Sequence, residues 1–226
     1  MGYPKKQGLY DPANEKENCG IGFVVNMKGE RSHEIVLQGI EILNKLEHRG
    51  ACGSDPLTGD GAGLLIQMPH KFFKTQCSKL DIELPEPGKY GSGLVFFPKD
   101  VRIHSFLDIF NRAIKNEGLS LLGWRKVPVD NTTIGHVARD AEPEIWQPFI
   151  GLGEEAIDQD ELERRLYLVR KQVGKEVHYS GEAEFFVSFY ICNLSTKTFC
   201  YKGQLMSTQL ETYFLDLNDP ELDSAL

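Results

Sequence analysis

The chain has 226 residues, of which 41% are apolar, and a formal net charge of −8. This length suits one large domain or two small ones, and the apolar share is sufficient for a hydrophobic core. The negative charge argues against a surface that binds nucleic acid or an anionic membrane. No run of about 18 apolar residues predicts a transmembrane helix, and residues 1–18 lack the apolar centre of a signal peptide.

Cysteine usage indicates a reducing compartment. The five cysteines are odd in number and contain no Cys-x-x-Cys pair, and the histidines show no spacing typical of metal ligands. This pattern favours free thiols in a cytoplasmic protein over a disulfide framework or a zinc site. We therefore expect no metal site in the chain.

The first predicted strand follows Cys19. Residues 20–25 (GIGFVV) place Ile21, Phe23 and Val25 on one face, and the glycines between them allow close approach of a backbone or ligand. Cys19 itself has two interpretations. It is a buried structural cysteine, which is the commoner case, or a nucleophile that becomes the N-terminus when the preceding residues are removed. In the second case its own α-amine, with an ordinary pKa near ~8, serves as the base.

A helix is predicted over residues 33–47, because apolar residues recur there at three- and four-residue steps. Its apolar stripe is wide, as in a helix that packs on a sheet. Ser32 is the expected N-cap and Glu34 suits the positive end of the helix dipole. Gly50 is the expected C-cap.

Further elements alternate along the chain without repeats. Two strands are predicted at residues 64–68 and 93–97, and helices follow over the segment that stops at Gly118 and over residues 160–176. Residues 185–192 are nearly all apolar, as in a strand covered on both faces, and a turn leads from them into a hairpin strand over residues 198–202. Sheets with helices outside them imply a layered α/β or α+β domain.

Several sequence blocks, in order, resemble a known family. Residues 19–23 (CGIGF), 46–51 (LEHRGA) and 55–65 (DPLTGDGAGLL) are similar to the amidotransferase domain (class II, N-terminal nucleophile) of the glutamate synthase large chain. The resemblance continues through residues 123–130 (GWRKVPVD) to residues 201–203 (YKG). It therefore covers nearly the whole chain.

This resemblance implies an α+β fold, the four-layer αββα sandwich of the N-terminal-nucleophile hydrolases, incomplete at the C-terminal end. Residues 1–18 would be a leader or propeptide, and residues 19–226 the N-terminal part of the amidotransferase domain. The chain contains no Asn-Gly pair and no His-Ser-Arg-Phe-Ser-Thr-like block, which related enzymes use for the oxyanion and the glutamine carboxylate. We therefore expect the chain to be a fragment that is inactive alone.

The resemblance also assigns residues. Cys19 would be the catalytic nucleophile, and Arg49, with Gly50, would help to hold its terminus and the bound glutamine. Arg49 is otherwise an exposed helix-end arginine that bonds the last carbonyls. Asp60 would support the pocket, or only form a turn, since Asp-Gly is a turn signal.

The activity implied is hydrolysis of L-glutamine to glutamate and ammonia through a cysteine thioester. Other domains would combine the ammonia with 2-oxoglutarate, using FMN, an iron–sulfur cluster and electrons from a small subunit or ferredoxin. No cofactor is expected in this segment. The alternatives are the amidotransferase domain of a different synthase, and a non-catalytic regulatory module in which Cys19 stays unprocessed.

Overall fold

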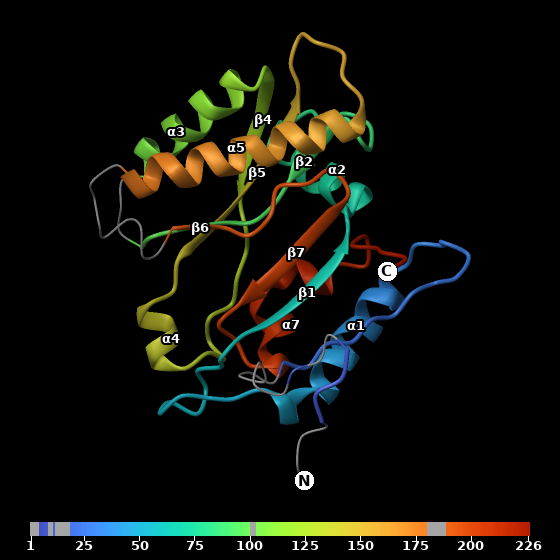
Figure 1. Cartoon of the computed structure of the whole chain (residues 1–226), viewed down its shortest axis with the longest axis vertical. Helices are drawn as coiled ribbons and strands as arrows, with labels where there is room; N and C mark the ends of the chain where they lie inside the picture. The colour runs from blue at the N-terminus through green and yellow to red at the C-terminus, as the bar shows by residue number, and fades with distance from the viewer. Residues whose placement is uncertain (1–4, 9–10, 12–18, 100–102, 180–188) are drawn as a thin grey trace.

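Two antiparallel sheets organise the fold (Figure 1). The computed structural model describes residues 5–8, 11, 19–99, 103–179 and 189–226. The larger sheet is centred on one long strand, which pairs with three of the other four; its strands are β2 (Tyr90–Ser92), β3 (Val95–Phe97), β4 (Leu119–Lys126), β5 (Glu144–Leu152) and β6 (Tyr190–Ile191). The smaller sheet pairs β1 (Ala62–Gln67) with β7 (Thr198–Gly203).

Helices flank both sheets. The α-helices are α1 (His33–Lys45), α2 (His70–Ser78), α3 (Ile103–Asn116), α4 (His136–Asp140), α5 (Gln159–Tyr179) and α7 (Leu210–Tyr213). Short 3-10 turns are η2 (Glu47–Arg49), η3 (Ser207–Gln209) and η4 (Leu215–Asn218). This mixture of helices and antiparallel sheets fits the α+β class. In the described part of the chain, no helix has the length and apolarity needed to cross a membrane.

One hydrophobic core lies where α3 and α5 cover a face of the larger sheet (Figure 1). Phe97 of β3 and Phe110 of α3 are fully buried there, and Phe110 meets the ring of Trp124 edge-on at 5.0 Å between centroids. Leu162, Leu166, Val169 and Val173 of α5 complete it at three- and four-residue steps. The apolar residues whose spacing predicted this helix therefore form the surface of α5 that packs on the core.

A second core joins the two sheets. Phe73 of α2 lies edge-on to Phe149 of β5 and to Phe199 of β7, at centroid distances of 5.5 and 5.0 Å. All three rings are fully buried, and α1 adds Val36 and Ile40 to the same cluster. Because side chains alternate along a strand, the opposite face of β1, which includes Leu65, stays exposed.

The predicted helices are confirmed, with small shifts at their ends. The Ser32 hydroxyl accepts a hydrogen bond from the backbone N–H of Ile35, as expected of an N-cap. Helix α1 ends at Lys45, two residues before the predicted end, and η2 continues the chain. Gly50 caps η2 rather than α1, and its φ of −86° is not left-handed. Helix α3 does stop before Gly118, whose φ is +67°.

Two strand predictions are wrong. Residues 20–25 are not part of a sheet, since no described strand pairs with them. Gly22 packs on α1 and Gly20 on the turn that follows it, and Ile21 and Phe23 are 94% and 81% exposed. The predicted hairpin is also absent, because β6 pairs with β3 while β7 pairs with β1. Strands at 64–68 and 93–97 are confirmed as β1 and β3. Residues 185–188 of another predicted strand lie outside the described residues, as does most of the predicted leader.

Candidate active site

Cys19 is exposed and begins an extended segment that runs along the end of α1. Two glycines make this contact close. A Cβ atom on Gly22 would lie only 2.4 Å from Cγ2 of Ile42, and one on Gly20 would lie 3.2 Å from Cβ of Arg49. Real Cβ atoms essentially never come within 3.0 Å of such a neighbour, so any side chain at position 22 would force Ile42 to move. The backbone next to Cys19 is thereby held against Arg49.

Arg49 ends the η2 turn. The turn is fixed by two backbone hydrogen bonds, from Arg49 N–H to the Leu46 carbonyl and from Gly50 N–H to the Glu47 carbonyl, at 2.8 and 3.0 Å. Among the described residues, the Arg49 guanidinium has no hydrogen bond or ion pair, so it does not cap the carbonyls of α1. An exposed guanidinium without another hydrogen-bond partner can bind a carboxylate through two parallel hydrogen bonds, as arginine commonly does.

A narrow loop brings Asp60 back to Gly50. Ala51 accepts a backbone hydrogen bond from Asp60 at 3.0 Å, and Gly53 donates one to Thr58 at 3.1 Å. As a result, a Cβ atom on Gly50 would lie 3.6 Å from the Asp60 carboxylate. The structure thus gathers the predicted site residues into one corner, with Gly20 on Arg49 and Gly50 beside Asp60.

The loop is anchored at Gly59. A Cβ atom there would lie 2.2 Å from the Leu205 carbonyl carbon and 2.3 Å from the Met206 nitrogen. Two backbones therefore touch directly, which only glycine allows. The glycine beside Asp60 thus has a packing role, and Gly61 on the other side has φ of +140°.

Asp55 is a buried carboxylate of this loop that the sequence analysis did not single out. It accepts hydrogen bonds from the Leu57 N–H at 3.1 Å, the Thr58 hydroxyl at 2.9 Å and the Val137 N–H at 3.2 Å. These bonds, above all that from the Leu57 N–H, hold the pKa of Asp55 below its ordinary value despite burial. An Asp followed by proline is a turn signal, so this anchor could have been found from residues 55–56.

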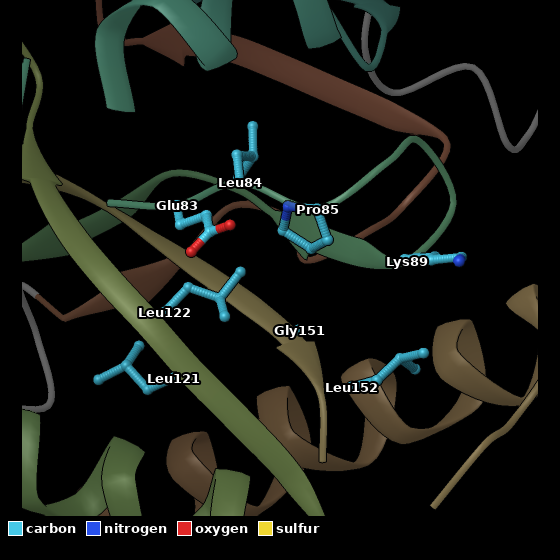
Figure 2. A pocket seen from close by; sticks show the side chains of 8 residues that line it. All are labelled: Glu83, Leu84, Pro85, Lys89, Leu121, Leu122, Gly151 and Leu152. Atoms are coloured by element: carbon cyan, nitrogen blue, oxygen red, sulfur yellow. The ribbon is translucent and has the colours of Figure 1, made fainter. Parts of the chain in front are cut away.

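A surface pocket of about 530 Å³ lies elsewhere in the fold (Figure 2). It is lined by the segment before β2 and by β4 and β5, through Glu83, Leu84, Pro85, Lys89, Leu121, Leu122, Gly151 and Leu152. It shares no residue with the corner around Cys19. In the described part of the chain, no group of three or more His, Cys, Asp or Glu side chains could hold a metal ion.

Comparison with known proteins gives the family. The family model for class II glutamine amidotransferases matches residues 19–226, and so begins at Cys19. The chain is 43% identical over 223 residues to the glutamate synthase (NADPH) large chain of Bacillus subtilis, a match over 98% of this chain and 14% of that protein. It is 42% identical over 224 residues to glutamate synthase (NADH) of Schizosaccharomyces pombe, over 96% of this chain and 10% of that protein.

A plant relative is more distant. Ferredoxin-dependent glutamate synthase 1 of Arabidopsis thaliana is 34% identical over 225 residues, which cover 98% of this chain and 13% of that protein. The chain thus spans between a tenth and a seventh of the length of these relatives. The family match covers all of the corner built by Cys19, Arg49, Gly50 and Asp60. The chain therefore belongs to the class II glutamine amidotransferases and is similar to the amidotransferase domain of glutamate synthases.

Proposed function

We propose that residues 19–226 are the N-terminal part of the glutamine-hydrolysing domain of a glutamate synthase. Two independent observations about Cys19 support this proposal. The class II family match begins at Cys19, and Cys19 is exposed and directly precedes Gly20, which packs against the side chain of Arg49. A structural cysteine would be buried, as Cys77 is.

The proposed reaction begins with removal of residues 1–18, which leaves Cys19 as the N-terminus. Its α-amine takes the thiol proton, and the thiolate attacks the carbon of the glutamine side-chain amide. The same amine returns the proton to the departing nitrogen, and ammonia leaves. Water then hydrolyses the thioester, releasing glutamate and restoring the thiol.

Arg49, Gly50 and Asp60 have supporting roles in this scheme. The Arg49 guanidinium would hold the carboxylate of the bound glutamine or the Cys19 terminus. Its position next to Gly20 supports this role. Asp60 would keep the Gly50 backbone in place, since its carboxylate lies on the side where a Cβ atom of Gly50 would be. We expect Arg49 to affect substrate affinity and Asp60 mainly local order.

The remaining chemistry belongs, in this proposal, to other domains of the complete protein. There the ammonia would react with 2-oxoglutarate to form glutamate, with FMN, an iron–sulfur cluster and electrons from a small subunit or ferredoxin. No residue of this chain is assigned to those groups. In the complete domain we expect the four-layer αββα architecture.

The thiol is tested by Cys19→Ser in the complete protein. We expect loss of glutamine-dependent glutamate formation, because a serine hydroxyl is a much weaker nucleophile than a thiolate, while activity with added ammonia survives. A glutamine analogue with an electrophilic side chain should label Cys19. Labelling mainly at Cys52, the other exposed cysteine, would refute the assignment.

Maturation needs a separate test, because the proposed base exists only after cleavage. Intact mass and N-terminal sequencing of active protein should show a chain that starts at Cys19. Full glutaminase turnover from protein that retains Asn18 would exclude the α-amine as the base.

A further inference from the structure

Two cysteines outside the candidate active site lie against each other. Cys192 directly follows β6 in the larger sheet, and Cys200 lies in the middle of β7 in the smaller sheet (Figure 1). The Cys192 thiol donates a hydrogen bond to the backbone oxygen of Cys200, 3.8 Å from its sulfur, so the two cysteines are in direct contact. The pair therefore connects the larger sheet to the smaller one, because β6 and β7 do not pair with each other.

The strands hold both cysteines in place. The Cys192 N–H donates to the Leu94 carbonyl at 2.8 Å, and Cys200 pairs with Leu65 of β1. Between them, the Ser195 and Thr196 hydroxyls donate to the Glu163 carboxylate of α5. The connection from Cys192 to Cys200 is thus fastened at both strands and at its turn, so the two sulfurs stay near each other.

The two thiols differ in environment. Cys192 is buried, whereas Cys200 is partly exposed. The neighbouring Cys192 thiol lowers the pKa of Cys200, and the Lys202 ammonium lowers it further, against the effect of burial. The neighbouring Cys200 thiol and burial raise the pKa of Cys192. Lys202, two residues along the same face of β7, is itself held by the Tyr190 hydroxyl at 2.8 Å.

We propose that Cys192 and Cys200 are a redox-active dithiol that is oxidised by hydroperoxides to a disulfide joining β6 to β7. The Cys200 thiolate attacks one peroxide oxygen; the O–O bond breaks, the peroxide is reduced, and the leaving oxygen takes a proton. Cys200 becomes a sulfenic acid, oxidised by two electrons. The Cys192 sulfur then attacks the Cys200 sulfur, the S–O bond breaks, and the Cys192 proton leaves with the hydroxide as water.

The test is peptide mapping of the full-length protein after treatment with hydrogen peroxide. Lys197 lies between the two cysteines, so trypsin places them in separate peptides, 176–197 and 198–202. After free thiols are alkylated, these peptides should appear as one disulfide-linked species that dithiothreitol separates. Cys52→Ser is the control and should give the same product. Recovery of both cysteines as free thiols, once Cys52 of the parent protein is oxidised, would overturn the proposal.

Three variants test the assigned roles. With Cys192→Ser, a sulfenic acid reagent such as dimedone should label Cys200; with Cys200→Ser, Cys192 should stay reduced. Lys202→Met should slow oxidation of Cys200 by about threefold or more, because it removes the nearby cation that favours the thiolate. Labelling at Cys192 in place of Cys200, or an unchanged rate in Lys202→Met, would overturn the proposed order of attack.

Discussion

Two neighbouring cations of β4 should differ greatly in their effect on stability. Arg125 and Asp216 form a buried ion pair, with side chains 7% and 3% exposed and N–O distances of 2.8 and 2.6 Å. Lys126 is 61% exposed and pairs with Glu144 at the surface, at 3.0 Å. Arg125→Met and Lys126→Met therefore each remove one positive charge from adjacent residues, the first buried and the second exposed.

Removal of the buried cation leaves an uncompensated anion in the core. In Arg125→Met the Asp216 carboxylate keeps the hydrogen bond from the Tyr201 hydroxyl, at 3.0 Å, but loses both bonds to the guanidinium. Breaking one half of a buried pair typically costs about 3–5 kcal/mol of unfolding free energy, whereas loss of an exposed pair costs about 0–1 kcal/mol. The double variant Arg125→Met/Asp216→Asn should lose less than Arg125→Met, because no charge is left buried.

Urea unfolding followed by tryptophan fluorescence measures these differences. Trp124 and Trp146 lie in β4 and β5, close to the pair, so their emission should report loss of the sheet. Equal m-values among the variants would show that the midpoints reflect stability alone. A loss of less than about 1 kcal/mol in Arg125→Met, similar to that in Lys126→Met, would refute the argument from the uncompensated charge.

Three further predictions concern the loop and the chain as a whole. Gly59→Ala should cost about 1–3 kcal/mol of stability because its Cβ atom meets Leu205, whereas Gly53→Ala, with nothing within 4 Å, should change it by less than about 0.5 kcal/mol. The lowered pKa of Asp55 stabilises the fold above the ordinary aspartate pKa near ~3.9 and not in acid, so the stability difference between the parent protein and Asp55→Asn should shrink in urea titrations as the pH falls through the folded-state pKa. In the proposed scheme, residues 1–226 alone should release ammonia from glutamine at least about a hundredfold more slowly than the complete protein, because this sequence contains no Asn-Gly pair to supply the oxyanion donor; comparable rates would refute this.

The helices could be predicted from the sequence because their signals are local. Ser32 at the start of α1, Gly118 after α3 and the spaced apolar residues of α5 each lie within a few residues of the feature that they determine. No strand was predicted for residues 144–152, which form β5 in the structure, and Pro148 within them is atypical of a central strand. In the structure, β2 pairs with residues 149–151 and β3 with residues 144–146, so Pro148 faces the gap between them.

Strand partners could not be predicted, because they depend on contacts far apart in the sequence. The turn between β6 and β7 has the composition of a hairpin, yet Glu163 of α5 fastens it through Ser195 and Thr196. Strand β7 then pairs with β1, placing Cys200 opposite Leu65. The hairpin interpretation used only the local signal, and the long-range pairing overrode it.

The glycines after Cys19 help to separate the residues that packing explains from those that indicate catalysis. They suggested a strand that a ligand or backbone approaches, but the close neighbours of Gly20 and Gly22 are side chains of Leu46, Arg49 and Ile42. Packing on α1 and on the η2 turn therefore explains the spacing of these glycines without any catalytic role. It does not explain the exposed thiol of Cys19, since packing would be served as well by serine or alanine at position 19. The functional argument consequently depends on Cys19 and Arg49, and the glycines contribute by holding the two residues together.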